Sequence, residues 1–160
     1  MPKGISWRAR LEEQLPLLGH RNWIVVADGA YPWQTAPGVE TVSTGAAQIE
    51  VVKAVLDAVD QAPHVRPIVY LDAELSFLLE EDAQGINRYR AELNDALADR
   101  AVRALPHDEI IAKLDAAGRA FHILLLKTTL TLPYTSVFLE LDCGYWSPAA
   151  EERLRRAFKA

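Results

Sequence analysis

The 160-residue sequence contains a single cysteine, Cys143. One cysteine excludes an intramolecular disulfide, and low cysteine usage is typical of proteins from reducing compartments. The charged N-terminal stretch MPKGISWRARLEEQ lacks the apolar core of a secretory signal. We therefore expect a cytoplasmic protein.

Long apolar runs and an excess of positive charge are also missing. No stretch approaches the roughly 18 apolar residues that a membrane span requires. The 22 acidic residues outnumber the 17 basic ones, for a net charge of −5. Because a nucleic-acid binder needs a basic face to neutralise phosphates, we expect neither nucleic acid nor a membrane as a partner.

Familiar cofactor and metal motifs are absent too. The sequence contains neither GxGxxG nor GxxxxGK[ST], so no cofactor is expected. Four histidines are scattered without the spacing of metal ligands, and no metal site is expected. We interpret His122 as a structural residue inside a predicted strand at 120–127 and His64 as a solvated loop residue.

The sequence does contain alternating strand and helix patterns. Short apolar, β-branched runs predict strands at 23–27, 39–43, 68–72, 102–105, 120–127 and 136–142. Helical periodicity appears at 8–18, 44–62, 82–100, 108–117 and after 147. This order indicates a single three-layer α/β/α domain with a mixed, mostly parallel sheet. We expect residues 1–145 to form this domain and residues 146–160 to form a C-terminal helical extension of it.

Four local signals bear on where these helices begin and end. Pro16 should kink or shorten the first helix, and Gly19 suits the left-handed position just past its end. Thr44 is the expected N-cap of the second helix, and Ser147, followed by Pro148, is the expected N-cap of the last.

The stretch LGHRNWIVVADGAYP places His20 before a predicted strand and Asp28 directly after it. In open α/β sheets, ligands bind at the carboxyl ends of the strands, which favours a functional Asp28. Structural interpretations compete with this one, because Asp28–Gly29 is a turn dipeptide and His20 could cap the preceding helix. Cys143 would need an activating base to act as a nucleophile, and we interpret it as an inert strand-end thiol.

The same stretch resembles the opening signature of the D-ribose pyranase and L-fucose mutarotase family, in which a Gly-His pair precedes an apolar strand that ends in aspartate. The segment AFHILLLKTTLTLPYTSVFLELDCG is similar to the closing segment of that family, and NRYRAEL resembles the middle helix of its fucose branch. The resemblance spans roughly residues 8 to 145. It implies a ring-like homo-oligomer, often a decamer, with sites near subunit boundaries.

Position by position, the resemblance implies a set of site residues. His20 falls on the catalytic histidine and Asp28 on its partner aspartate, while His107 falls on a further active-site histidine. Tyr134 matches a sugar-contacting tyrosine, and Ser136 stands where the family has asparagine.

Two further features bear on how closely the site follows the family. Tyr31 and Trp33 follow Asp28 and could stack on a sugar face or pack at a subunit contact. The chain departs from the family at KTTLTLP and in the helix that follows Tyr145.

The implied chemistry is the opening and closing of a sugar ring at its anomeric carbon. One group removes the anomeric hydroxyl proton while another protonates the ring oxygen, and histidine serves both steps because its reference pKa of about 6.5 is close to cellular pH. Asp28 is expected to orient the ring of His20. The predicted protein is a cofactor-free isomerase, a mutarotase or pyranase of a fucose-like or ribose-like monosaccharide.

Two alternatives stay open at the level of sequence. A catalytically silent sugar-binding or sensing relative is favoured by Ser136 and by the altered KTTLTLP loop, and opposed by the retention of His20, Asp28 and Tyr134. A purely structural oligomer would show no sugar protection against heat.

The C-terminal segment SPAAEERLRRAFKA carries a narrow apolar stripe that includes Leu154 and Phe158. Isolated helices shorter than about 12–15 residues are marginal in water. We expect this segment to pack on its own domain or on a neighbouring subunit, adding stability without supplying catalytic groups.

Overall fold

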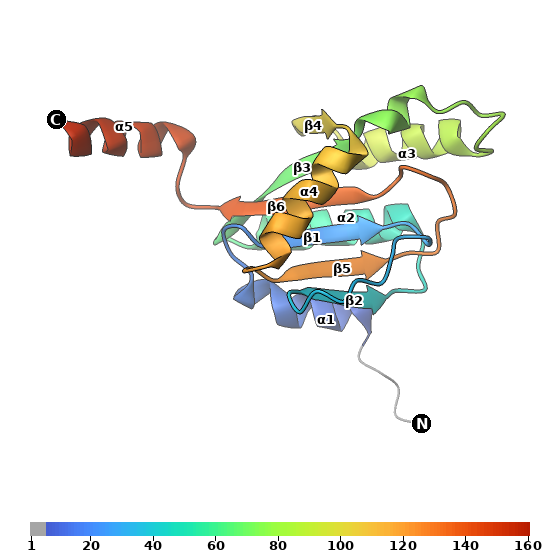
Figure 1. The fold of residues 1–160 in the computed structure, drawn as a ribbon, viewed down its shortest axis with the longest axis horizontal. Helices are drawn as coiled ribbons and strands as arrows, with labels where there is room; N and C mark the ends of the chain where they lie inside the picture. The colour runs from blue at the N-terminus through green and yellow to red at the C-terminus, as the bar shows by residue number, and fades with distance from the viewer. Residues whose placement is uncertain (1–5) are drawn as a thin grey trace.

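The computed structural model describes residues 6–160, in which six strands form one mixed sheet of order β2-β5-β1-β6-β3-β4 (Figure 1). β6 pairs antiparallel with both of its neighbours, whereas the other strands of this sheet all point the same way. The bounds are β1 (Trp23–Ala27), β2 (Val39–Ser43), β3 (Val65–Asp72), β4 (Val102–Leu105), β5 (Ile123–Lys127) and β6 (Val137–Cys143).

Helices cover both faces of the sheet, which confirms the expected three-layer α/β/α fold. One face carries α1 (Trp7–Gln14), α2 (Gln48–Gln61) and α3 (Ile86–Leu97), and the other carries α4 (His107–Gly118). Two short 3₁₀ turns, η1 (Leu15–Leu17) and η2 (Ala73–Phe77), complete the layers. None of the helices within residues 6–160 is long and apolar enough to cross a membrane.

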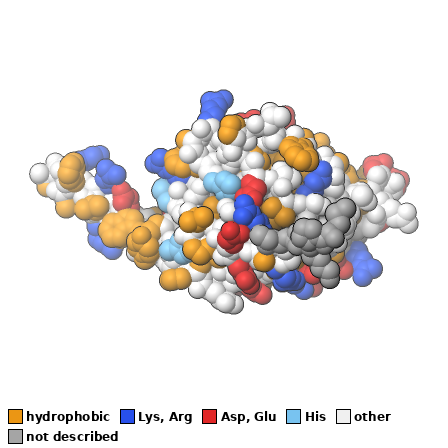
Figure 2. Space-filling model, turned by 90° about the horizontal axis from the view of Figure 1, so that it is seen from below, with side chains coloured by type: hydrophobic (Ala, Val, Ile, Leu, Met, Phe, Trp, Pro, Cys, Tyr) orange, Lys and Arg blue, Asp and Glu red, His pale blue; other side chains and the backbone are white. Residues whose placement is uncertain are grey.

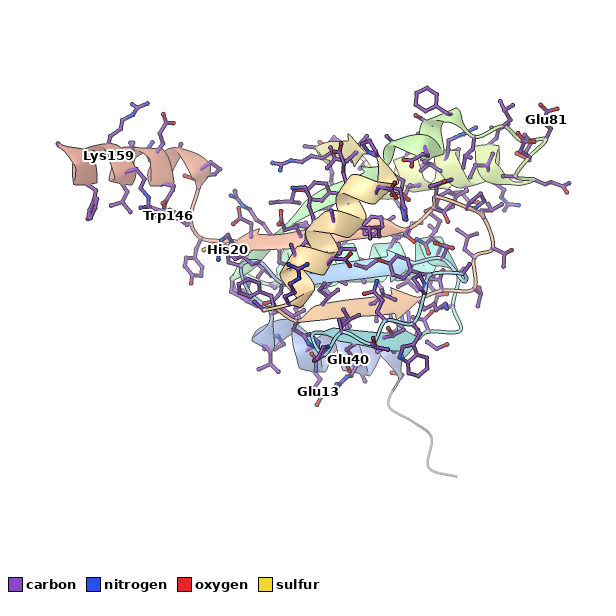
Figure 3. The ribbon with its side chains drawn as sticks, in the orientation of Figure 1. Glu13, His20, Glu40, Glu81, Trp146 and Lys159 are labelled. Carbon is purple, nitrogen blue, oxygen red and sulfur yellow. The ribbon has the colours of Figure 1, made fainter. Side chains whose placement is uncertain are left out.

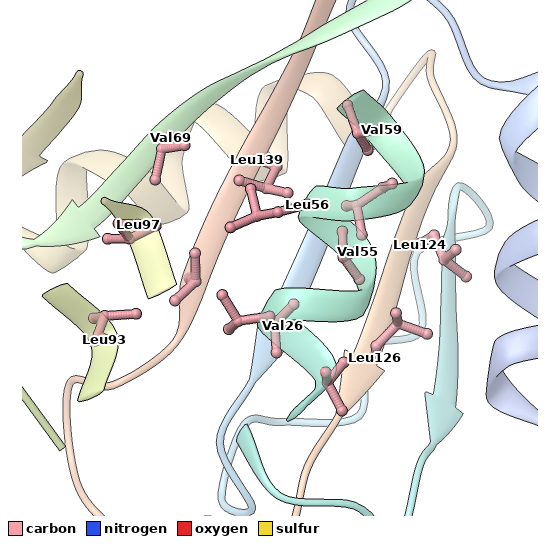
Figure 4. Close-up of a cluster of buried hydrophobic side chains, with 14 of the residues drawn as sticks. Val26, Val55, Leu56, Val59, Val69, Leu93, Leu97, Leu124, Leu126 and Leu139 are labelled. Carbon is pink, nitrogen blue, oxygen red and sulfur yellow. The ribbon is translucent and has the colours of Figure 1, made fainter. Parts of the chain in front are cut away.

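The two cores follow from the alternation of side chains along each strand. In β1, Ile24 and Val26 point to the α2 side, whereas Trp23 and Val25 point to the α4 side, and all of them are buried. Figure 4 shows the larger core, in which side chains of α2 and α3 pack against the sheet. The helices contribute Val55, Leu56, Val59, Leu93 and Leu97, and the strands contribute Val26, Val69, Leu124, Leu126 and Leu139. A central strand buried on both faces explains the continuous apolar run of β1.

Helix ends agree with the sequence signals only in part. Pro16 does shorten the first helix, because α1 ends at Gln14 and continues as the 3₁₀ turn η1. Gly19 does not take the left-handed conformation, which Arg21 adopts instead with φ of 77°. Thr44 does not cap α2: its hydroxyl donates to the carbonyl of Lys127 (2.8 Å) and so ties the loop before α2 to β5.

The two histidines assigned to strand and loop also differ from expectation. His122 precedes β5 rather than lying within it, and its Nε2 is 3.2 Å from a carboxylate oxygen of Glu40. Nε2 of His64 lies 3.0 Å from the carbonyl oxygen of Leu15, so this half-buried side chain joins η1 to the start of β3. Both histidines therefore have structural partners.

The C-terminal helix α5 (Pro148–Lys159) begins as predicted, since the Ser147 hydroxyl accepts a hydrogen bond from the Ala150 N–H (3.0 Å). Of the two positions expected for it, packing on its own domain is wrong, and packing on a neighbouring subunit stays a prediction. Figure 1 shows α5 projecting away from the sheet, and none of its residues is buried. Figure 2 shows hydrophobic side chains gathered on this projecting segment, next to basic ones.

Two glycines give a test of packing between the loop before β2 and the end of α4. A Cβ on Gly38 would lie 2.4 Å from the Gly118 carbonyl oxygen and 2.9 Å from that of Phe121, whereas a Cβ on Gly19 would meet nothing within 4 Å. We expect Gly38→Ala to lower the free energy of unfolding by about 1–3 kcal/mol, the usual cost of overpacking. Gly19→Ala is the matched control and should change it by less than about 0.5 kcal/mol in urea titrations. Equal stability of the two variants would contradict the packing described.

Candidate functional site

The candidate site lies at the edge of the sheet where β1, β3, β4 and β5 end and where β6 begins. A cavity of about 430 Å³ opens there, lined by Asp28, Ala30, Tyr31, Pro32, Gln34, Asp72, His107, Ile111, Pro133 and Tyr134. Volumes of this size are typical of pockets for small ligands. Four of the residues singled out in the sequence, Asp28, His107, Tyr134 and Tyr31, are therefore brought together.

A buried carboxylate holds the imidazole of His107. Asp72 Oδ1 lies 2.9 Å from His107 Nδ1, and the Asp72 side chain is 1% exposed. Burial raises the pKa of Asp72, although the hydrogen bond with His107 opposes that rise. The other oxygen, Oδ2, has no hydrogen-bond partner within residues 6–160. An acceptor at Nδ1 fixes the proton there and leaves Nε2 as the nitrogen available to a ligand.

The backbone of His107 is held by a second acid. The carboxylate of Glu74 accepts from the His107 N–H at 3.0 and 3.1 Å, one bond to each oxygen. α4 begins at His107 after Pro106, which offers no side-chain cap. Glu74 thus caps α4 from η2, and an acidic group at a helix N-terminus is also favourable to the helix dipole.

Asp28 is fixed by Ser136 across the junction of β1 and β6. The Ser136 hydroxyl donates to Asp28 Oδ1 (2.7 Å) and accepts from the Asp28 backbone N–H (3.1 Å). The second oxygen of Asp28 accepts from the Ala30 N–H (3.3 Å), so the turn interpretation of Asp28 is also correct. Ser136 is buried and does not line the cavity, which places it behind Asp28 rather than against a ligand.

The aromatic residues divide between the cavity and the surface. Tyr31 is buried against Phe138 and lines the cavity. Tyr134 adopts a left-handed backbone (φ 57°), and its ring meets His107 edge-on with centroids 5.7 Å apart. Trp33 is 86% exposed and lies outside the cavity lining.

His20 lies at the opposite edge of the sheet. It precedes β1, whereas Asp28 follows it, and strand residues rise about 3.3 Å each, so the two edges are on the order of 15 Å apart. His20 Nδ1 is 2.9 Å from Asp142 Oδ1 at the end of β6 (Figure 3). The expectation that Asp28 orients His20 is therefore wrong within one chain, because Asp142 does so.

The other carboxylate oxygen of Asp142 pairs with the guanidinium group of Arg66. Arg66 Nη2 donates to Asp142 Oδ2 (2.7 Å), and the Cys143 N–H donates to Oδ1 (2.9 Å). Burial acts to raise the pKa of Asp142, but these hydrogen bonds outweigh it and hold the pKa below the usual range. His20 is 59% exposed and faces a hollow of about 580 Å³ beside Trp146.

A third hollow contains none of the residues assigned to the site from the sequence. This hollow of about 740 Å³ runs between the loop before β2 and the end of α4, and the polar side chains in its lining are Gln34, Asp115, Arg119 and His122. No group of three metal-ligating side chains occurs in the part of the chain that the structure describes.

The sequence matches no family model and no curated protein. Solved structures that are similar include Bacillus subtilis RbsD complexed with D-ribose, at 18% identity and a TM-score of 0.58, covering 89% of this chain and 98% of that one. FucU from Bifidobacterium longum is 19% identical (TM-score 0.56), covering 89% of this chain and 98% of that one. The Streptococcus pneumoniae fucose mutarotase in complex with L-fucose is 17% identical (TM-score 0.54), covering 89% of this chain and 96% of that one. The chain has the fold of RbsD and of a fucose mutarotase. The fold that the resemblance implied is confirmed.

From the sequence, Asp72 and Glu74 are possible rim groups of the site with no assigned role, and Asp142 was missed. Asp72 ends the strand run IVYLD just as Asp28 ends WIVVAD, and this repeated strand-end aspartate is the signal that places it at the rim. The contact between Asp72 and His107 results from the pairing of β3 with β4. Asp72 is opposite Leu105 in this parallel ladder, and His107 lies two residues further on.

The two histidine-bound aspartates should titrate in opposite directions from the ordinary value of about 3.9. In carboxyl ¹³C NMR titrations we expect Asp72 to titrate above this value and Asp142 below it. A depressed pKa stabilises the fold above the unfolded-state pKa, and this contribution is lost as the pH falls through the folded-state pKa. Asp142→Asn should therefore destabilise the protein at pH 7, and the difference from wild type should shrink towards pH 2. The same order of pKa values for both residues would contradict the assignments.

Proposed function

We propose that this chain binds a free monosaccharide in the cavity beside Asp28 and His107 and interconverts its ring forms. The observation that carries the proposal is the buried Asp72–His107 pair, which leaves one imidazole nitrogen available at a cavity large enough for a small ligand. The fold supports it, since the similar structures of RbsD and of the fucose mutarotase are complexes with D-ribose and L-fucose.

The ring-opening step needs one proton taken and one proton given. In the proposed mechanism, Nε2 of His107 removes the anomeric hydroxyl proton, and the imidazolium that forms is stabilised by Asp72. The electron pair of that O–H bond becomes the carbonyl π bond, the anomeric carbon–ring oxygen bond breaks, and the ring oxygen takes a proton from an acid. Ring closure reverses these steps, and attack on the other carbonyl face gives the other anomer.

Asp28 and the tyrosines serve binding in this proposal. The carboxylate of Asp28 is held rigid by Ser136 and Ala30, so it can accept from sugar hydroxyls without reorganising. Tyr31 and Tyr134 present aromatic surface at the same cavity for the apolar C–H faces of a sugar.

His20 joins this site only across a subunit boundary. A second copy of the chain, placed with its His20 edge against the cavity, would bring a histidine that Asp142 already orients. This arrangement fits the homo-oligomer that the sequence resemblance implies. We therefore propose a composite site, with His107 from one copy and His20 from the next as the base and the acid.

A sugar-binding protein without catalysis is the second candidate. It is favoured by Ser136, whose hydroxyl is engaged by Asp28 and is not available to a ligand. Such a protein would bind sugars at the same cavity and leave their anomeric exchange at the uncatalysed rate.

Exchange NMR on L-fucose and D-ribose tests the proposal. Wild-type protein should accelerate exchange between anomers of at least one sugar, and His107→Gln should lower this rate by about 10²–10⁴-fold, the usual contribution of general acid–base catalysis. His122→Gln is the matched control, because His122 pairs with Glu40 outside the cavity. Saturable sugar binding with no acceleration would favour the silent alternative, and the absence of both would overturn the proposal.

Mixing two inactive variants tests the composite site. We expect His20→Ala and Asp28→Asn each to abolish exchange alone. In randomly mixed oligomers each site takes His20 from one copy and Asp28 from another, so about a quarter of the sites should be intact. Recovery of roughly that fraction of wild-type activity after co-refolding supports the composite site. If no activity returns although mass spectrometry shows mixed oligomers, His20 does not act across a boundary.

A further inference from the structure

The segment after β6 forms an arm that the body of the chain leaves uncovered. This C-terminal arm, residues 144–160, consists of a four-residue connection and α5. Leu154 is 51% and Phe158 83% exposed, and Trp146 is 43% exposed. Within residues 6–160, the side-chain hydrogen bonds and ion pairs of residues 146–159 all stay inside the arm: Trp146 with Glu151, Ser147 with Ala150, Arg155 with Glu151, and Arg156 with Glu152.

An uncovered arm of this kind has a physical reason to seek a partner. α5 has 12 residues, which is marginal for a helix without tertiary packing. Four large aromatic or aliphatic side chains on one short segment, those three and Tyr145, also make an exposed apolar surface of the kind that marks interaction sites. The partner should offer apolar surface as well as a charge that suits the arm.

The charge of the arm is opposite to that of the remaining chain. Residues 147–160 contain four basic and two acidic side chains, which leaves 13 basic and 20 acidic residues elsewhere. The arm is net positive and the remainder is net negative. A second copy of the same chain therefore attracts the arm electrostatically.

One surface of the body combines apolar side chains with uncompensated acidic ones. The acidic patch, residues 77–82, contains Phe77 (81% exposed) and Leu79 (54% exposed), followed by Glu80, Glu81 and Asp82, and has no basic residue. Glu80 is used locally, because it accepts from the N–H groups of Gly85 and Asn87 before α3. Glu81 and Asp82 are exposed and take part in no ion pair within residues 6–160.

The arm does not lie along the acidic patch of its own chain. Figure 3 shows Lys159 and Glu81 at opposite ends of the molecule. The arm leaves beside the start of β3, and the patch follows η2 beyond the end of that strand, so eight strand residues, about 26 Å, separate them.

We propose that the arm docks on the acidic patch of a second copy, with Leu154 and Phe158 against Phe77 and Leu79 and with the arm's basic side chains near Glu81 and Asp82. The two surfaces differ, so the contact is heterologous and links copies head to tail, which closes a ring or extends a filament. The contact is separate from the cavity of the proposed function, and its test does not depend on sugar exchange.

A charge swap tests the docking by sedimentation velocity. Arg153→Glu with Lys159→Glu reverses the arm, and Glu81→Lys with Asp82→Lys reverses the patch. We expect each double variant to weaken association about tenfold or more, and the chain carrying all four substitutions to recover wild-type association. Glu12→Lys with Asp57→Lys is the control, because both positions are exposed and lie on α1 and α2 away from the patch. Failure of the four-substitution chain to recover would overturn the pairing.

Disulfide trapping tests the contact even where other interfaces hold the copies together. Phe158→Cys and Phe77→Cys are made in separate chains, each with Cys143→Ser, and the two are mixed and oxidised. We expect a cross-linked pair that contains one chain of each kind, and no such product when Leu17→Cys, exposed on η1, replaces Phe77→Cys.

A lipid surface is the alternative binding partner for a basic amphipathic helix such as α5. Wild-type protein that pellets with phosphatidylserine–phosphatidylcholine vesicles, with no mixed cross-link in solution, would overturn the second copy as the occupant. Wild-type protein that stays monomeric at micromolar concentrations would overturn it as well. Sugar exchange measured on the same variants keeps a failure of the arm distinct from a failure of the proposed function.

Discussion

The reversed direction of β6 determines which side chains can meet in this molecule. β6 pairs with β1 on one side and with β3 on the other, and its residues 137–139 and Leu141 are buried, so it joins the two parallel halves of the sheet. Because it runs antiparallel, its start brings Tyr134 and Ser136 to the edge where the other strands end. Its end brings Asp142 and the arm to the edge of His20. Each chain therefore carries two clusters of polar chemistry at opposite ends of the same strands.

A buried amide holds together the edge that carries the cavity. Gln48, at the start of α2, donates to the carbonyls of Val26 and Thr135 and accepts from the Thr128 hydroxyl at 2.7 Å. These three bonds join the ends of β1 and β5 to the segment before β6. Leaving a buried polar group without a partner costs about 1–3 kcal/mol, so this network favours one relative position of the three segments. Asp28 and Ser136 each lie within two residues of it, which keeps their spacing constant.

Local sequence signals predicted the elements well, and tertiary pairing set the contacts that they missed. β1, β2 and β4 match their predicted ranges because all three contain the β-branched residues that favour strands, although only β1 is buried throughout. The predicted contact between His20 and Asp28 was wrong because the two residues flank the same strand. The length of β1 therefore separates them, although they are close in sequence. Asp72 met His107 through the register of β3 and β4, which no local pattern contains. The arm was predicted as a helix. Helical periodicity does not identify the surface against which the arm packs, because that surface belongs to another part of the structure.

The chain holds two carboxylate–histidine pairs whose surroundings differ in kind. Asp72 is buried with one oxygen unpartnered, which raises its pKa, whereas Asp142 lies between Arg66 and His20 with its pKa held low. A neighbouring carboxylate favours the charged form of an imidazole, and of the two carboxylates Asp142 is the more exposed. Acid and base roles are separated most readily when two titratable groups have different environments. In the composite site proposed above, His20 beside Asp142 would supply the proton for the ring oxygen, and His107 beside Asp72 would receive the proton of the anomeric hydroxyl.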